Sequence, residues 1–432
     1  MPLNILGTLL VKGTDGIPGW EYIRSFGPLV ITTISLKYYF GGVKNTWERD
    51  LHGKVYLVTG GTAGLGRSVV EELAKRGAQL ILLTSTTPEE NPWLVDYIDD
   101  LRNDTENILI YTEKCDLSSL YSIRKFATSW LDNTPPRRLD GVICLAGESI
   151  PIGFPRQVSI DGVERQIAIN YLGHFHLLTL LSPALRVQPP DRDVQILMTT
   201  CFTQAMGDID LNDPLWLNKR YPSKNPWRIF GSSKLMLLMF AKEFQKKIEQ
   251  QPRKDNLPHN VRINIINPGI MRSPSTRRII SFGAVWGLFL YLILYPIWFI
   301  FLKSCTQGAQ SYLHVLQNPK FQELKGGNLI SDCKIYNTAR NEPNDEEMCK
   351  QLYDKTNKMI DELEKKSAIE RKKLSTKKEK ESISSKNNKK DKMPLFPEKK
   401  PEKKPDSTAT TNTSTTSTKP SSGSTRKRNS KK

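Results

Sequence analysis

The stretch VYLVTGGTAGLG, residues 55–66, decides the fold of this chain. Its first four residues are apolar and predict a buried strand, and the glycines that follow predict a tight turn. Helical spacing over residues 67–76 predicts a helix that Gly77 ends, and a second apolar run begins at residue 80. The order is therefore strand, turn, helix, strand.

This unit suits the pyrophosphate of a dinucleotide. Glycines permit positive φ and a close approach of the backbone, and the start of the following helix offers free N–H groups and partial positive charge. A glycine string alone is weak support, but the flanking strands and helix strengthen it. A glycine turn that binds no nucleotide is the alternative.

The charge of the chain is concentrated at its C-terminal end. The formal net charge is +18 over 432 residues, and residues 366–432 hold 21 Lys or Arg against 7 Asp or Glu, a net +14 that leaves +4 for the rest. Residues 361–432 carry few apolar side chains, so we expect a disordered tail there. We consider a solvated extension, attraction to anionic lipids and a nuclear-import signal for it. No nucleic-acid partner is expected for this protein, and a nucleic-acid binder that uses the tail is kept as a third functional option.

The cysteines and histidines predict no metal site. The six cysteines form no C-x-x-C pair, and the five histidines have no ligand spacing with them. This pattern indicates reduced thiols in a cytosol-facing protein.

Two apolar segments predict contact with a membrane. Residues 279–302 hold no charged side chain and are long enough to cross a hydrocarbon core of about 30 Å. A span, an in-plane insertion and a buried core helix are open, and we favour a monotopic insertion because residues on both sides belong to one domain. Within the N-terminal segment 1–50, residues 27–40 form a shorter apolar run interrupted by Lys37, read as an anchor or as a helix packed on the domain.

Further motifs resemble the short-chain dehydrogenase/reductase family. They are the T-G-x-x-x-G-x-G turn, CDLS at residues 115–118, VICLAG at 142–147, NYLGHF at 170–175 and NPGI at 267–270. VICLAG departs from the family's Asn-Asn-Ala-Gly because Cys144 and Leu145 replace both asparagines. The motifs QGAQ at 307–310, GGN at 326–328 and SDC at 331–333 resemble the membrane-associated retinol-dehydrogenase-like group.

The resemblance implies an α/β fold, a Rossmann-like doubly wound parallel sheet over residues 51–360. It also implies a set of cofactor-binding residues: Gly60, Thr62, Gly64, Leu65, Gly66, Thr84, Asp116, Gly147, Asn170, Lys234, Pro268, Gly269, Ile270 and Ser273. Thr84-Ser85-Thr86 offer hydroxyls and no carboxylate to the adenosine ribose, so NADP is favoured and NAD is the alternative. Arg67 is a candidate for the 2′-phosphate.

The resemblance also assigns the reacting centre, with one departure. In the family a serine positions the substrate carbonyl, a tyrosine transfers the proton, a lysine lowers the tyrosine pKa, and an asparagine holds a relay water. The matching positions here are Thr200, Phe230, Lys234 and Asn170, so the phenol is missing. Tyr221 is a competing register, but its lysine, Lys224, comes one residue too early.

Two functional hypotheses follow. The first is a membrane-associated NAD(P)-dependent oxidoreductase acting on a lipidic ketone, aldehyde or alcohol, with protons delivered by water, Lys234 or Tyr221. The second is a non-catalytic NADP-binding scaffold at a membrane surface. For either function we expect membrane lipids as partners and consider a homodimer. The expected location is the cytosolic face of the endoplasmic reticulum or a lipid droplet.

Overall fold

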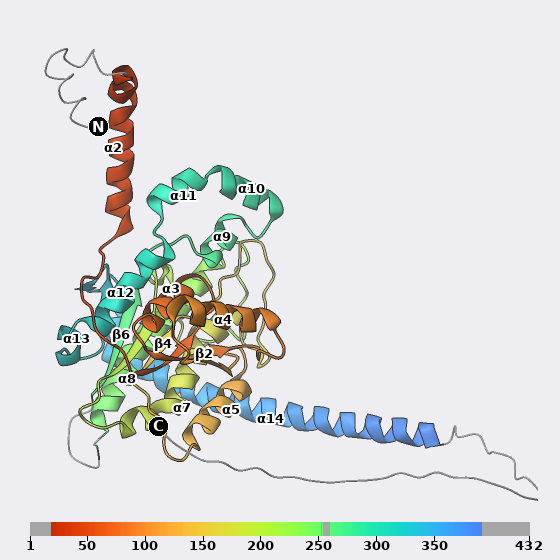
Figure 1. The fold of residues 1–432 in the computed structure, drawn as a ribbon. Coiled ribbons are helices and arrows are strands. Elements are labelled where there is room, and N and C mark those ends of the chain that lie inside the picture. Colours follow the sequence, from red (N-terminus) through yellow and green to blue (C-terminus); the bar gives the residue numbers. More distant parts are fainter. Residues whose placement is uncertain (1–18, 252, 254–259, 391–432) are drawn as a thin grey trace, which may run out of the picture. The chain divides into compact units, whose positions relative to one another are not determined.

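An eight-stranded sheet organises the protein in the computed structural model, which describes residues 19–251, 253 and 260–390 (Figure 1). The strand order is β3-β2-β1-β4-β5-β6-β7-β8; β1 to β7 run parallel and β8 is antiparallel to β7. The bounds are β1 Val55–Thr59, β2 Gln79–Thr84, β3 Ile110–Lys114, β4 Gly141–Cys144, β5 Val194–Thr199, β6 Val261–Asn267, β7 Leu329–Ser331 and β8 Lys334–Tyr336. The predicted Rossmann-like parallel sheet is confirmed.

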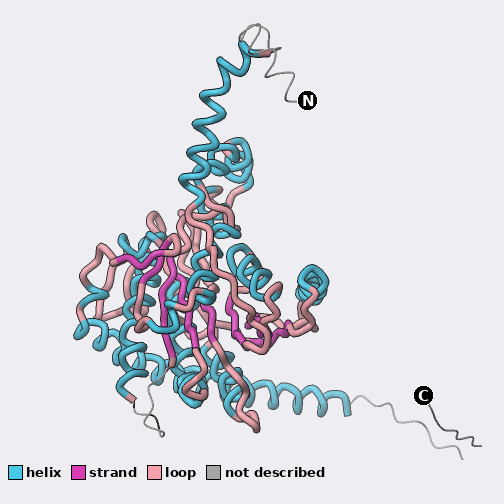
Figure 2. The backbone as a smooth tube through the Cα atoms, turned by 60° about the vertical axis from the view of Figure 1, so that its left-hand side comes forward, coloured by secondary structure: helices cyan, strands magenta, loops and turns pink. Residues whose placement is uncertain are grey.

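Helices cover both faces of this sheet (Figure 2). One apolar cluster joins the sheet to α3 Gly64–Ala74, α4 Pro92–Thr105, α12 Cys305–Gln317 and α13 Lys320–Glu323. The other joins it to α5 Leu120–Leu131, α6 Arg165–Ile167, α7 Gly173–Val187, α8 Trp227–Gln250 and α14 Glu346–Lys390. Successive residues of β1 alternate between the clusters, Leu57 in one and Val58 in the other. Burial on both faces explains why the central strands β1, β2 and β4 are mostly apolar along their length.

The order of the sheet reverses at β1, whose neighbours are β2 on one side and β4 on the other. Val58 pairs with Leu82 of β2 and with Ile143 of β4. In doubly wound sheets, ligands bind beyond the carboxyl ends of the strands at such a reversal. The glycine turn follows β1 and therefore lies at this point.

Helix α14 carries the folded unit past residue 360. Leu363 is buried, Glu364 pairs with Arg124 of α5, and Ser367 donates a hydrogen bond of 2.9 Å to Asp161. Contacts divide the chain into units of residues 1–372 and 373–432. The predicted start of the disordered tail at residue 361 is thus too early, because side chains of the next turns of α14 pack on the domain. The helix continues to Lys390, and residues 391–432 lie outside the described part.

The predicted apolar segments form α2 Trp20–Gly41 and three short helices, α9 Pro274–Ile280, α10 Val285–Ile293 and α11 Tyr295–Phe301. Residues 1–18 of the N-terminal segment lie outside the described part. The segment that holds α9, α10 and α11 leaves the domain after Arg272 and returns to it at Lys303, and we call this place the neck. There Arg272 N donates to Lys303 O at 2.9 Å, and Lys303 N donates to Ile270 O at 3.1 Å. Among the described helices none is by itself long and apolar enough for a bilayer crossing; α9 and α10 together reach that length and composition, but they meet at 106°.

Candidate cofactor and reaction site

The glycine turn between β1 and α3 tolerates no side chain at two positions. Gly60 has φ 69°, and a Cβ there would lie 2.6 Å from Cα of Ala146. A Cβ on Gly66 would lie 1.9 Å from the carbonyl oxygen of Gly60. The turn is therefore pressed against the end of β4 and against itself, and its glycines carry no side chain that would keep a phosphate from the backbone.

A buried hydrogen-bond chain links this turn to Asn170. Thr59 Oγ1 accepts from Ala146 N at 3.2 Å and lies 3.0 Å from His174 Nε2, and His174 Nδ1 lies 3.3 Å from the carbonyl oxygen of Asn170. The carbonyl can only accept, so we assign the proton to Nδ1, and Thr59 then donates to Nε2. Burial and the charge of Lys234 lower the pKa of His174 to about 3, which keeps the imidazole neutral.

Sequence reasoning gave His174 no role and missed this link. The available signal was its spacing of four from Asn170, which places both side chains on one helical face.

Asn170 lies in a π-helical turn, Ala168–Leu172, between α6 and α7. Its Nδ2 donates to Glu148 O at 3.0 Å, and its Oδ1 accepts from Glu148 N at 2.8 Å. The amide thus holds the backbone just after Gly147. Single π turns within helices often occur at functional sites.

Lys234 of α8 completes the cluster. A Cβ on Gly147 would lie 3.5 Å from Lys234 Nζ and 3.3 Å from Asn170 Oδ1, so Gly147, Asn170 and Lys234 meet at one point. The ammonium group donates to Thr199 O at 3.1 Å, and burial lowers the pKa of this lysine. None of the ion pairs in the described part of the chain includes Lys234. A buried ammonium with one carbonyl partner retains N–H groups for the hydroxyls of a cofactor ribose.

Phe230 precedes Lys234 by one turn of α8, and its ring centre lies 5.7 Å from Lys234 Nζ. Tyr221 comes before α8 begins at Trp227. The phenolic oxygen of Tyr221 is buried and has no hydrogen-bond partner among the residues that the structure describes, and burial and Glu164 raise its pKa to about 12.

Thr200 is fully buried at the end of β5. Its hydroxyl donates to Gln204 Oε1 at 2.9 Å and contacts the carbonyl oxygen of Lys234 at 3.5 Å. These partners belong to the 3₁₀ turn Phe202–Met206 and to the α8 backbone. In this conformation the hydroxyl serves an internal contact, and its role toward a substrate carbonyl stays a prediction.

The other predicted cofactor residues follow the carboxyl ends of parallel strands and so share one edge of the sheet. Thr62, Gly64 and Leu65 lie in or just after the glycine turn, and Pro268, Ile270 and Ser273 lie after β6. Several already have polar partners: Thr84 Oγ1 donates to Thr86 O, Asp116 accepts from Ser118, Gly269 N donates to Asn267 Oδ1, and Ser273 caps α9. The described residues contain no group of three His, Cys, Asp or Glu that could hold a metal ion.

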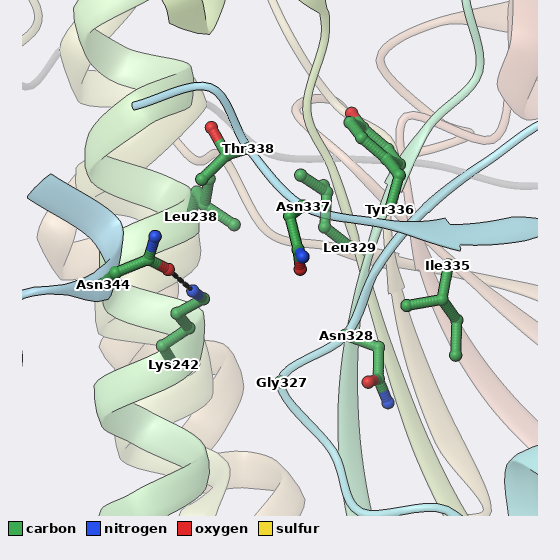
Figure 3. A pocket seen from close by; sticks show the side chains of 10 residues that line it. All are labelled: Leu238, Lys242, Gly327, Asn328, Leu329, Ile335, Tyr336, Asn337, Thr338 and Asn344. Carbon is green, nitrogen blue, oxygen red and sulfur yellow. Dashed lines mark hydrogen bonds between the residues drawn. The ribbon is translucent and has the colours of Figure 1, made fainter. Parts of the chain in front are cut away.

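A small cavity of about 80 Å³ lies elsewhere, between α8 and the β7–β8 hairpin (Figure 3). Lys242 borders it and donates to Asn344 Oδ1 at 2.8 Å. None of the predicted cofactor residues lines it. The cavity is therefore separate from the Lys234 cluster.

A glycine turn at the reversal of a parallel sheet, with a buried lysine beside it, defines a dinucleotide-binding fold of the Rossmann type. Comparison with known proteins narrows this class. The family model described as short chain dehydrogenase matches residues 54–201. The chain belongs to the short-chain dehydrogenase/reductase family, as the sequence motifs predict, and members of this family bind NAD(P).

Two curated relatives support this assignment along most of the chain. An uncharacterized oxidoreductase of Saccharomyces cerevisiae is 48% identical over 390 residues, which covers 86% of this chain and 95% of the relative. Retinol dehydrogenase 12 of Mus musculus is 31% identical over 316 residues, which covers 72% and 89%. An uncharacterized protein from Mycobacterium paratuberculosis has a similar fold, with a TM-score of 0.52 at 22% identity over 74% of this chain and 98% of that one.

Proposed function

We propose that this protein is a membrane-associated oxidoreductase that uses NADP to interconvert a lipidic ketone or aldehyde and the corresponding alcohol. The observation that carries the proposal is the meeting of Gly147, Asn170 and Lys234 beside the glycine turn. These residues fit a nicotinamide dinucleotide: the turn would hold the pyrophosphate, and Lys234 would bind the ribose next to the nicotinamide. When bound, the nicotinamide supplies or accepts a hydride.

The end of β2 favours NADP over NAD. NAD-binding sheets commonly place an acidic residue there for the ribose 2′-hydroxyl, and this chain has Thr84, Ser85 and Thr86. Arg67 in the first turn of α3 is exposed, with its guanidinium carbon 5.6 Å from the centre of the Tyr97 ring. This guanidinium is our candidate for contact with the 2′-phosphate.

Proton delivery in the proposed reaction cannot use a phenol at position 230. Burial lowers the pKa of Lys234 and raises that of Tyr221 to about 12. A group with a lowered pKa releases its proton more readily, so Lys234, or a water bound to it, is the better proton donor. Loss of a positioned acid typically costs about 10²- to 10⁴-fold, so we expect slow turnover.

Large exposed apolar side chains support membrane association. Tyr38 of α2 is 88% exposed and Val285 of α10 is 86% exposed. The other large side chains of this kind on these helices and on α11 are Tyr22, Ile23, Phe26, Leu29, Val30, Ile31, Ile34, Leu36, Tyr39, Trp286, Leu288, Phe289, Leu290, Leu292, Ile293, Tyr295, Ile297, Phe299 and Phe301. We define these side chains as the apolar platform. Such a surface fits monotopic insertion into the cytosolic leaflet of the endoplasmic reticulum or a lipid droplet.

A lipidic substrate fits the position of this platform. The part of the platform on α10 and α11 follows the Pro268–Ser273 loop, which we propose for the cofactor, in the chain. Two relatives are named retinol dehydrogenases, and retinol is a lipidic alcohol.

The second candidate function is a non-catalytic NADP-binding scaffold at a membrane. Two observations favour it: Phe230 has no proton to transfer, and the Thr200 hydroxyl is bonded to Gln204. The two functions share cofactor binding and differ in turnover. A homodimer stays a prediction for either, and gel filtration with light scattering in detergent would test it.

The test compares binding and turnover on one sample. We expect NADPH to raise the melting temperature of the detergent-solubilised protein more than NADH does, and NADPH to be oxidised with some long-chain or isoprenoid carbonyl compound. Lys234→Ala should abolish both effects. Lys242→Ala, on the same helix beside the separate cavity, should abolish neither. A melting shift without turnover across the panel would favour the scaffold, and no shift with either nucleotide would refute both functions.

A further inference from the structure

Lys37 joins the two apolar segments into one unit. Its Nζ donates to the carbonyl oxygens of Phe299 at 2.6 Å and Leu302 at 3.3 Å. The last carbonyls of a helix have no partner within the helix, so Lys37 of α2 caps the end of α11. The rings of Phe40 and Phe301 add an edge-to-face contact at 5.1 Å. The lysine that interrupts the N-terminal apolar run thus has a defined position beside α11, where Figure 1 places α2 and α11 on the same side of the sheet.

Arg272 brings a second cation to the same place. Lys37 Nζ lies 4.8 Å and the guanidinium carbon of Arg272 lies 4.7 Å from the centre of the Phe299 ring. Arg272 also donates to the hydroxyl of Tyr295 at 3.1 Å. It stands at the neck, where its backbone N–H bonds to Lys303 O. Two cations therefore border one aromatic ring at the base of the apolar platform.

Neither of these cations has an acidic partner in the described part of the chain. Their neighbours do: Lys303 pairs with Asp332, and Arg278 lies 3.8 Å from Glu148. Burial and the charge of Arg272 lower the pKa of Lys37, as expected when positive charge is not compensated.

Unused hydrogen-bond donors lie in the same region. Nε of Arg272 and Nε1 of Trp298, in α11, are buried and have no acceptor within the described part of the chain. Buried donors without partners cost about 1–3 kcal/mol each, so such groups usually have a ligand or water.

We propose that Lys37 and Arg272 bind the phosphate of an anionic phospholipid when the apolar platform enters the leaflet. This inference rests on the proposed membrane association. Cations at the root of an apolar surface lie at headgroup depth once that surface is inserted. The phosphate would accept from Lys37 Nζ and from the guanidinium of Arg272, whose side chain would turn to bring its unused Nε–H to the phosphate, and would neutralise the pair.

Flotation of the full-length protein with vesicles tests this site. One set of vesicles contains phosphatidylcholine alone and the other contains phosphatidylcholine with phosphatidic acid. Wild type should bind both and prefer the second. Because each basic residue near an anionic surface contributes about 1 kcal/mol, the double variant Lys37→Met with Arg272→Met should lose roughly tenfold or more of that preference while it still binds phosphatidylcholine.

A matched control variant distinguishes binding at this site from a general effect of the protein's net charge, to which the basic tail contributes. Lys75→Met with Lys320→Met removes two exposed cations from other parts of the domain and should keep the preference. An equal loss in both double variants, or no loss in the first, would overturn the inference. Arg272→Gln alone leaves the Lys37 cap in place and should still lose part of the preference if the double variant does not fold.

Two further outcomes are distinguishable. If wild type binds neither kind of vesicle, membrane association itself fails. If wild type shows no preference for phosphatidic acid, while inorganic phosphate at fixed ionic strength raises the melting temperature of wild type and not that of the double variant, the site binds free phosphate and the lipid assignment is wrong. Potassium chloride at the same ionic strength is the control for screening.

Discussion

The ammonium group of Lys234 lies 5.7 Å from the centre of the Phe230 ring, one turn earlier on α8. A cation in this place would stabilise a phenolate, but the ring has no hydroxyl to ionise. Under the predicted register, the chain retains the electrostatic half of a proton-transfer pair and lacks the proton carrier. Each function proposed here depends on what this difference does to turnover.

Phe230→Tyr should supply the missing carrier. The new phenol would stand near Lys234, so its pKa should fall below the ordinary value of about 10. If the protein turns over slowly, NADPH oxidation should rise about 10²-fold or more. A pH titration of tyrosinate absorbance against wild type would measure the pKa. Phe230→Leu is the control and should leave turnover at the wild-type level; an unchanged rate in the tyrosine variant would show that the phenol is not what limits the reaction.

Gly66→Ala should destroy the glycine turn. Its Cβ would lie 1.9 Å from the carbonyl oxygen of Gly60, so the backbone must move. Overpacking of this kind lowers the free energy of unfolding by about 1–3 kcal/mol. The displaced N–H groups should no longer bind the pyrophosphate of NADPH. Urea unfolding and nucleotide thermal shift measure the two effects. Gly27→Ala makes the same chemical change in α2, where the nearest atom would be 3.9 Å away, and should keep NADPH binding.

His174→Gln should flatten the dependence of stability on acid pH. The pKa of His174 is about 3 in the folded protein and about 6.5 when unfolded, so below pH 6.5 the unfolded state binds a proton that the folded state does not. Wild-type stability should therefore fall by up to about 1.4 kcal/mol for each pH unit below 6.5 from this group alone. The free energies of unfolding of wild type and variant should converge between pH 7 and 4. Parallel curves for wild type and His174→Gln would contradict the assignment.

Glu364→Gln should loosen α14 from α5. Burial would raise the pKa of Glu364, but His176 and Arg124 outweigh it and lower the pKa to about 2. Because the folded-state pKa is depressed, the stabilisation is present above pH 4.5 and is lost as the pH falls toward 2. The variant should lose about 1 kcal/mol at neutral pH, a typical value for a partly exposed pair, and little at pH 2. Chemical unfolding monitored by circular dichroism measures this, with Glu362→Gln, an exposed neighbour, as the control.

Sequence reasoning located the fold because it depends on local pattern, and the residues that it predicts for the cofactor stay a prediction. Apolar runs, glycine spacing and helical periodicity placed β1, α3 and β2 within a few residues of their bounds. Long-range contacts were not readable in the same way. The burial of Thr200, the bond from His174 to Thr59 and the packing of α14 on the domain join residues far apart in the chain, and no local pattern encodes them.

By itself the sequence determined that this chain forms a parallel α/β sheet with a dinucleotide turn, since strand and helix periods and the sterics of glycine are properties of neighbouring residues. It also determined that the residue four before Lys234 has no titratable group. Only the tertiary structure decided which side chains share the buried edge with Lys234, and that Lys37 and Arg272, 235 positions apart in the numbering, border one ring. The physical reason is that burial and charge neighbours depend on how distant segments pack, and these set hydrogen bonding and pKa.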